Sequence, residues 1–348
     1  MPDVTTTDAD ADLAVAAAGD RPMSPEWHWH PDLPIPNSPV FDWPPRPLAA
    51  LKWLAGYWLA VSMIVIEVGT ACLVWYVLQP GPEQTASFAP GWIALMYLRN
   101  LALMFIFAGG LHLYLYTFRR QGNVRKFDAR DLARDRKAFT WRDQVLDNMF
   151  WTCISGVTVW TAFEVLYVWA LANGHVPTTG FAANPLWFVA GFVLIPIWSS
   201  FHFYWIHRAL HWPPLYRLAH GLHHRNVNIG PWSGISMHPV EHVLYFSSVL
   251  IHFVVASHPV HVFFHMHLQA LNPLASHSGF DGLMVRGRKR LELGDFFHQL
   301  HHRYFECNYG TAEMPWDRWF GSFHDGTPDA RRRIRARMAG KPGHAAMR

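Results

Sequence analysis

Ten histidines recur in short, regularly spaced clusters in the second half of this 348-residue sequence. In chain order they are His207 and His211 in HRALH, His220, His223 and His224 in HGLHH, His238 in HPVE, His277 in HSGFD, and His298, His301 and His302 in HQLHH. Neutral imidazole is the most common protein ligand of transition metals, and residues three or four positions apart share one face of a helix. The clusters therefore indicate a site that could enclose more than one metal ion.

The number of imidazoles argues against a single zinc ion. Structural zinc takes four protein ligands, and catalytic zinc takes three ligands and a water molecule. Two metal ions with open positions would use the whole set, and iron suits such a site because imidazole binds it well and open positions permit oxygen chemistry. Soluble di-iron bundles use Glu and Glu-x-x-His ligands. The corresponding carboxylates are missing here, so we expect a histidine-rich cage.

The elements that must position these clusters are long and apolar. Four runs contain few or no charged residues: 53–78, 91–118, 150–172 and 186–206. Because a helix rises 1.5 Å per residue, about 20 residues cross the roughly 30 Å hydrocarbon layer of a bilayer, and each run is long enough to span it. Four buried helices of a soluble bundle are the alternative, which runs longer than about 18 residues disfavour.

A fifth apolar region, residues 240–274, is interrupted at Ser257, His258 and Pro259. Each half is too short to span a membrane, so we expect a hairpin that enters the bilayer and returns to the same face. The predicted fold is all-α. It is an integral membrane bundle of four transmembrane helices plus a re-entrant helical hairpin, with a cytoplasmic histidine-rich helical cap.

Positive charge predicts the orientation. The loop at residues 119–142 is rich in Arg and Lys, which places it in the cytoplasm by the positive-inside rule. Counting spans from this loop puts the loops near Gly81 and Gly174 outside, and the segment after Ile206 inside. All histidine clusters and the basic tail RRRIRAR then lie on the cytoplasmic face.

The first 48 residues are acidic and rich in proline, and they lack the basic start and apolar stretch of a cleaved secretion signal. We interpret residues 1–48 as a cytoplasmic arm, disordered to about Met23 and then draped on the domain through Trp27, Trp29 and Trp43. The three cysteines form no disulfide framework or CxxC pair, and the net charge of +4 suits the inside loops of a membrane protein without implying nucleic acid.

At this point the chain resembles the fatty acid hydroxylase and sterol desaturase superfamily of integral-membrane di-iron oxygenases, whose histidine pattern is HxxxH, HxxHH and HxxHH. It is also similar to that family in HPVE, HSGFD, HHRYFECNYG and WDRWFGSFHDG, so that the resemblance runs from about residue 150 to residue 327. The resemblance implies a membrane di-iron hydroxylase domain at residues 49–327, followed by a basic tail at 328–348.

The resemblance implies nine ligands, with His238 as a tenth ligand or a hydrogen-bond partner of one: His207, His211, His220, His223, His224, His277, His298, His301 and His302. We expect Glu241, Asp281, Asp295 and Asp317 to accept hydrogen bonds that fix imidazole tautomers.

Two departures from the family pattern affect the metal site. Ser199 and Ser200 stand where many relatives have an acidic residue, about two turns before the first cluster. Pro273 stands where some relatives have a further histidine.

The expected reaction is hydroxylation of an unactivated C–H bond of a membrane lipid, such as a fatty acyl chain or a sterol, with two iron ions, O2 and two electrons. A lipid or sterol desaturase of the C-5 type is the alternative, and a metal transporter or sensor is disfavoured because the clusters lie at one surface and not along a path at mid-span. The sequence contains no motif for an electron carrier, so a separate donor of the ferredoxin or cytochrome b5 type, with its reductase, is expected. We expect a multi-pass protein of a bacterial inner membrane rather than of the endoplasmic reticulum.

Overall fold

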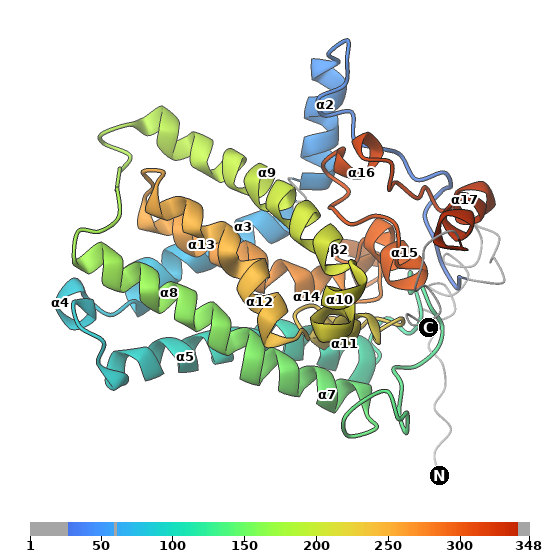
Figure 1. The fold of residues 1–348 in the computed structure, drawn as a ribbon, viewed down its shortest axis with the longest axis horizontal. Helices are drawn as coiled ribbons and strands as arrows, with labels where there is room; N and C mark the ends of the chain where they lie inside the picture. Colours follow the sequence, from blue (N-terminus) through green and yellow to red (C-terminus); the bar gives the residue numbers. More distant parts are fainter. Residues whose placement is uncertain (1–26, 59–60, 340–348) are drawn as a thin grey trace.

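The computed structural model describes residues 27–58 and 61–339, and helices dominate these residues (Figure 1). Three helices are long and apolar enough to cross a membrane. In chain order they are Pro90–Thr117, which begins with α5 (Pro90–Met104) and includes α6 (Gly110–His112); Gln144–Ala172, which contains α7 (Gln144–Phe150) and α8 (Val157–Ala172); and α9 (Pro185–Leu210). They correspond to the second, third and fourth predicted spans.

The first predicted span is not confirmed. It begins within α2 (Pro47–Trp53), which projects away from the bundle in Figure 1, and continues through α3 (Val61–Leu73) to residue 78. Residues 59 and 60, between these helices, lie outside the described residues. Over the described part, the apolar helix Ile64–Leu78 is shorter than the three candidate spans.

The apolar region that follows the fourth predicted span folds as a helical hairpin. Its outward arm is α12 (Pro239–Phe246), extended by a 3-10 helix to residue 253, and its return arm is α13 (Pro259–Ala270), followed by α14 (Asn272–Ser276). Proline at the first position of α12 and of α13 is favourable, because that position needs no N–H donor. Entry of this hairpin into a bilayer and its return to the same face stay a prediction.

The tip of the hairpin lies beside the loop between α8 and α9, because Ser257 pairs with Thr178 there. The return arm, α13, packs against α3, α8 and α9. Eleven of its twelve residues are buried. This arm is therefore part of the protein core and is not exposed to lipid.

The histidine clusters gather at the opposite end of the bundle, which we call the histidine end (Figure 1). The main short elements here are α10 (Pro213–Leu215), α11 (Gly221–His224), β1 (Gly282–Val285), β2 (Arg288–Glu292), α15 (Phe296–Tyr304), α16 (Trp316–Trp319) and α17 (Pro328–Ala339). The two strands form an antiparallel hairpin that the all-α prediction did not include. The far end of the bundle carries α4 (Pro82–Thr85).

The basic loop and the N-terminal arm also lie at the histidine end. In the loop, the backbone carbonyl of Arg130 accepts a hydrogen bond from the Asn228 side chain, just after α11. In the arm, Trp27 is buried and packs edge-on against Phe296, with ring centroids 5.0 Å apart. One end of the molecule thus carries the clusters, the basic loop and the described part of the arm, as span counting predicted.

Candidate metal centre

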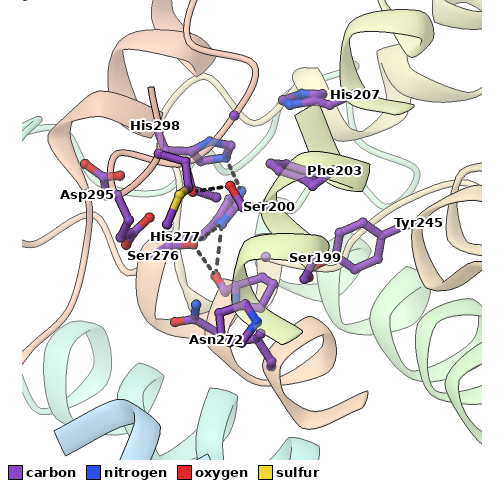
Figure 2. A pocket seen from close by; sticks show the side chains of 18 of the residues that line it. Ser199, Ser200, Phe203, His207, Tyr245, Asn272, Ser276, His277, Asp295 and His298 are labelled. Carbon is purple, nitrogen blue, oxygen red and sulfur yellow. Dashed lines mark hydrogen bonds between the residues drawn. The ribbon is translucent and has the colours of Figure 1, made fainter. Parts of the chain in front are cut away.

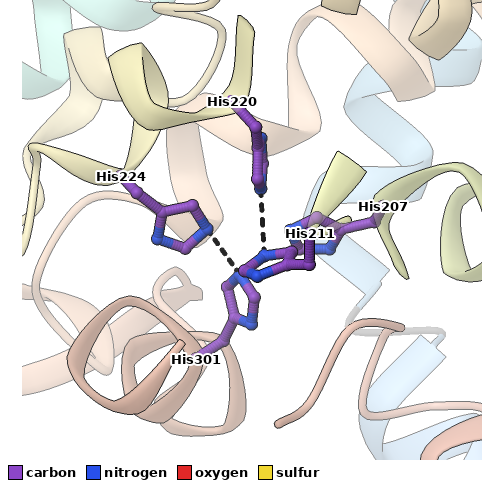
Figure 3. A group of neighbouring side chains, drawn as sticks. All are labelled: His207, His211, His220, His224 and His301. Carbon is purple, nitrogen blue, oxygen red and sulfur yellow. Dashed lines mark hydrogen bonds between the residues drawn. The ribbon is translucent and has the colours of Figure 1, made fainter. Parts of the chain in front are cut away.

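Nine of the ten predicted histidines form two buried groups, and within each group the potential ligand atoms lie within 4.8 Å of one another. The five-histidine group contains His207, His211, His220, His224 and His301, whose rings converge in Figure 3. The four-histidine group contains His223, His277, His298 and His302. Both HxxHH motifs are divided between the groups, so each motif serves both.

In the five-histidine group, the ring nitrogens meet across different elements. The Nε2 atoms of His211, at the end of α9, and His220, just before α11, are 3.1 Å apart. The Nε2 atoms of His224 on α11 and His301 on α15 are 2.9 Å apart.

The four-histidine group has the same type of geometry. His277 follows α14, and its Nε2 lies 3.1 Å from that of His302 and 3.0 Å from that of His298, both on α15. The Nε2 atoms of His298 and His302 are 3.2 Å apart.

Backbone carbonyls behind the rings fix which nitrogen points inward. The Nδ1–H groups of His207, His301 and His277 donate to the carbonyl oxygens of Tyr309, Cys307 and Pro273, at 2.7, 2.6 and 2.9 Å. Because a carbonyl oxygen can only accept, Nδ1 must carry the proton. The Nε2 of each neutral ring then presents a lone pair to the centre of its group.

These lone pairs fit metal ions. The inward Nε2 of His301 faces that of His224 at 2.9 Å, a contact that repels when both atoms carry lone pairs and that a shared cation would relieve. Burial, together with the charge of neighbouring histidines, lowers the pKa of grouped rings outside α9 well below its usual value, among them His220, His224, His277, His298, His301 and His302. Neutral, closely spaced imidazoles suit divalent transition-metal ions, and two groups suit two ions.

Two buried carboxylates stand behind the five-histidine group. Oε1 of Glu241 lies 2.7 Å from Nδ1 of His220, as expected for a group that fixes its tautomer. Oε1 of Glu306 lies 3.7 Å from Nδ1 of His211, and Oε2 of Glu306 accepts a hydrogen bond from the Tyr309 hydroxyl. Glu306 was not predicted, because it lies beyond the end of α15, where the helical spacing of the histidine cluster no longer applies.

A tight turn after α15 positions Glu306. Phe305 has φ 64° and ψ −57°, and the N–H of Glu306 donates to the carbonyl of Tyr304. This is a γ-turn of the rare, strained kind. It reverses the chain, so that the carbonyl of Cys307 reaches the His301 ring.

The three predicted aspartates lie outside both groups, in different roles. Asp317 accepts hydrogen bonds from the backbone N–H groups of Tyr309 and Gly310, and so holds the carbonyl that binds His207. Asp295 caps the N-terminus of α15 by accepting from the N–H of Phe297, and burial raises the pKa of Asp295 to about 7.

The two remaining predicted residues, Asp281 and His238, belong to neither histidine group. Asp281 pairs with Arg125 and Lys289, and the hydrogen bonds of the described residues do not link it to a grouped histidine. His238 is the one predicted ligand outside both groups. It caps α12, where its Nδ1 accepts from the N–H of Val240, and thus holds the helix that carries Glu241.

The departures from the family pattern have structural counterparts. Ser200 of α9 forms hydrogen bonds with Thr311 and with Trp316 of α16, at 2.7 and 3.1 Å, and the hydrogen bonds of the described residues do not link it to a grouped histidine. The carbonyl of Pro273 accepts from His277. The residue that replaces a possible ligand therefore orients one.

A close backbone contact supports the four-histidine group. A Cβ atom on Gly234 would lie 2.5 Å from the carbonyl oxygen of Pro273, so only glycine fits there. Two residues later, the carbonyl of Ser236 lies 3.4 Å from Nδ1 of His223. The close contact at Gly234 therefore packs the segment that carries the Ser236 carbonyl, the partner of His223, against the Pro273 carbonyl, the partner of His277.

One cavity touches both histidine groups. It has about 1370 Å³ of empty space including its mouth, and it is lined by His207 and His220 of one group and by His223, His277 and His298 of the other. Figure 2 shows Ser199 and Phe203 of α9 and Tyr245 of α12 on its walls. The cavity continues to Ile64 and Glu67 on α3, so it connects both histidine groups with an apolar helix.

The chain is similar to one known protein family and to several named enzymes. Residues 192–322 match the fatty acid hydroxylase family model. The chain is 32% identical over 145 residues to a Delta(7)-sterol 5(6)-desaturase of Gibberella zeae, an alignment that covers 41% of this chain and 44% of the relative. It is 24% identical over 240 residues to the Delta(7)-sterol-C5(6)-desaturase of Nicotiana tabacum, covering 68% and 83% of the two chains.

The similarity to a Delta(7)-sterol 5(6)-desaturase of Saccharomyces cerevisiae is 32% identity over 120 residues, covering 34% of this chain and 32% of the relative. The chain thus spans less than half the length of these two fungal relatives. No solved structure matches the chain. The three relatives come from fungi and a plant, so they do not favour the bacterial membrane that we expected. The match to the fatty acid hydroxylase model contains all nine grouped histidines, and the relatives are named sterol desaturases, so the similarity to the fatty acid hydroxylase and sterol desaturase superfamily that the motifs predicted is confirmed.

Proposed function

We propose that this protein is an oxygen-dependent di-iron oxidoreductase that hydroxylates an unactivated C–H bond of a membrane lipid. The observation that carries the proposal is the pair of buried imidazole groups that open on one cavity beside apolar helices. Desaturation of a lipid at the same site is the second candidate, because the relatives are named sterol desaturases while the matching family model is that of fatty acid hydroxylases.

The five-histidine group would hold one iron ion and the four-histidine group the other. When bound, the ions supply the reduction of O2 and the oxidising power that removes hydrogen from carbon. The two electrons would come from a separate ferredoxin or cytochrome b5 type of protein with its reductase. The arginines of the 119–142 loop and of α17 provide positive charge that attracts an acidic donor.

The protein itself orients the ligands and excludes water. The carbonyls of Tyr309, Cys307 and Pro273 hold three rings with Nε2 inward. Phe203 stacks on His207, with ring centroids 4.8 Å apart, so the cavity wall beside this imidazole is apolar. A lipid chain in the cavity would therefore meet the site in surroundings that are poor in water.

The chain would lie in the membrane with the histidine end in the cytoplasm. In this arrangement residues 49–327 form the enzyme domain, with four spans and the α12–α13 hairpin inserted from the cytoplasmic side. Three helices of sufficient length and the basic loop at the histidine end support it. A lipid could then enter the cavity sideways from the bilayer.

Metal analysis and lipid mass spectrometry test this function. Purified protein should hold about two irons per chain, and lipid extracts from cells with and without the gene should differ by a gain of 16 mass units for hydroxylation or a loss of 2 for desaturation. His224→Ala and His298→Ala should lose iron and lipid oxidation, whereas His238→Ala, outside both groups, should keep both. Full lipid oxidation by either of the first two variants would contradict the proposal.

A further inference from the structure

Two glutamates in apolar helices of this protein have opposite surroundings. Glu164, on α8, is buried and fully bonded: it accepts hydrogen bonds from Asn100 and Trp160, at 2.8 and 2.7 Å, and pairs with Arg99. Glu67, on α3, is also completely buried, but neither of its carboxyl oxygens has a partner among the described residues. A buried carboxyl group without a partner costs several kcal/mol or more, so such a group in an apolar helix points to a function.

The cavity that Glu67 lines is the one that touches both histidine groups. Its lining includes apolar residues such as Ile64, one turn before Glu67 on α3, and also the acidic residues Glu241 and Glu292. Tyr245, another lining residue, cannot serve as its donor in this geometry, because its hydroxyl donates to the carbonyl of Gln269 at 2.9 Å. The Glu67 carboxyl is thus an available hydrogen-bond acceptor within the proposed lipid site.

We propose that Glu67 accepts a hydrogen bond from a hydroxyl group of the lipid substrate and thereby positions its reacting carbon. This inference rests on the proposed function for the identity of the cavity. A hydroxyl is favoured over an ammonium group, because Glu67 is buried on an apolar helix, where an ammonium would add a second buried charge with its own desolvation cost. A site built to bond a hydroxyl also rejects the analogue that lacks it, since the buried acceptor would then stay unpaired.

Binding of matched probes tests the assignment. The iron-loaded protein in lipid nanodiscs would be titrated with radiolabelled lathosterol and its analogue without the hydroxyl, and separately with octadecanol and octadecane. We expect the hydroxyl-bearing member of one pair to bind at least about tenfold more tightly, as one hydrogen bond to a carboxyl group allows. The pair that shows the preference identifies the source of the hydroxyl, either a sterol or a straight-chain lipid.

Variants connect this preference to Glu67. Glu67→Leu should reduce the ratio of affinities to about one, and Glu67→Gln should retain part of it because the amide oxygen still accepts. Glu164→Gln is the matched control, since it makes the same change at a buried glutamate that does not line the cavity, and it should keep the wild-type ratio. Equal binding of both members of both pairs by the wild type, or an unchanged ratio in Glu67→Leu, would overturn the inference.

Iron content and oxidation of the same probes separate this inference from the proposed function. A Glu67-dependent preference in a protein that binds no iron and oxidises no lipid would leave the hydroxyl site standing and remove the enzyme. Oxidation of lipids without any preference for the hydroxyl would leave the enzyme and remove the role of Glu67.

Discussion

The two histidine groups differ in what stands behind their rings. In the five-histidine group, Glu241 lies 2.7 Å from His220 and Glu306 lies 3.7 Å from His211. In the four-histidine group, the partner of His277 is the neutral carbonyl of Pro273. A carboxylate behind an imidazole raises its basicity and adds negative charge near the metal. The two proposed iron positions are therefore electrostatically unequal.

The two histidine groups also differ in the cavities that their rings line. Three of the four rings in the four-histidine group line the cavity that touches both groups, against two of the five rings in the other group. His211 of the five-histidine group also borders a second cavity, together with Arg208 and Arg337. The four-histidine group thus faces the proposed lipid site more fully, and the carboxylate-backed group reaches towards a surface with positive charge.

The largest effect is expected from removal of one ring in each group. His224→Ala should preferentially deplete the iron of the five-histidine group and His298→Ala that of the four-histidine group, each with a fall in lipid oxidation of at least about 100-fold, since loss of a ligand exceeds loss of its hydrogen-bond partner. Metal analysis with Mössbauer spectroscopy would show which signal remains. The same residual iron signal in both variants would mean that the groups are not separate sites.

A smaller effect should follow from Glu241→Gln, which keeps the size of the side chain and removes its charge behind His220. We expect iron affinity to fall about 10- to 100-fold in the five-histidine group, where Glu241 contacts a ring, and by less in the four-histidine group. Competition with a chelator, followed by counting the retained iron, measures this loss. Equal loss from both groups would contradict the proposed electrostatic difference.

Gly234→Ala should act on the other group. The added Cβ would meet the Pro273 carbonyl at 2.5 Å and displace the partner of His277. We expect a destabilisation of about 1–3 kcal/mol, as is typical of overpacking, with weaker iron binding in the four-histidine group. Thermal unfolding and iron retention are the measurements. Gly221→Ala, whose nearest contact would be 3.2 Å, is a milder glycine control beside the five-histidine group.

The smallest effect concerns pH. Burial raises the pKa of Asp295 to about 7, whereas an unfolded aspartate titrates near about 3.9. The folded state therefore binds this proton more tightly, and stability should fall as the pH rises from about 4 to about 7. In iron-free protein, Asp295→Asn should reduce this decline and keep the helix cap, because asparagine is also a good N-cap. The same pH dependence of the unfolding temperature in both proteins would exclude Asp295 as its source.

Helical spacing explains how far the sequence could predict the metal site. The pairs His207 and His211, His220 and His224, and His298 and His302 are four residues apart, and each pair stays within one group. Adjacent histidines are separated because consecutive helical residues point about 100° apart. This division follows from the spacing once the fold is known, whereas Glu306 reaches His211 only through the γ-turn at Phe305, which the sequence does not reveal.

The apolar runs were less informative about their surroundings. A run of apolar residues suits a helix in lipid and a helix in a protein core equally well, so the burial of α13 could not be predicted from its composition. The hydrogen bond from His277 to Pro273 was also hidden, because any residue type provides a backbone carbonyl. The sequence predicted best the side chains that would bind metal directly, namely the nine grouped histidines.

The C-terminal helix has a consequence for where the chain can be shortened. Arg337, on α17, donates hydrogen bonds to the backbone carbonyls of Gly321 and Glu306, and Ile334 on the same helix is buried. The family match ends at residue 322, and the tail was predicted to begin at residue 328. A protein cut at either point would lose the contacts that brace the segment carrying Glu306. The folding unit therefore extends beyond the recognisable domain, and truncations designed from the family boundary would remove part of the support of the metal centre.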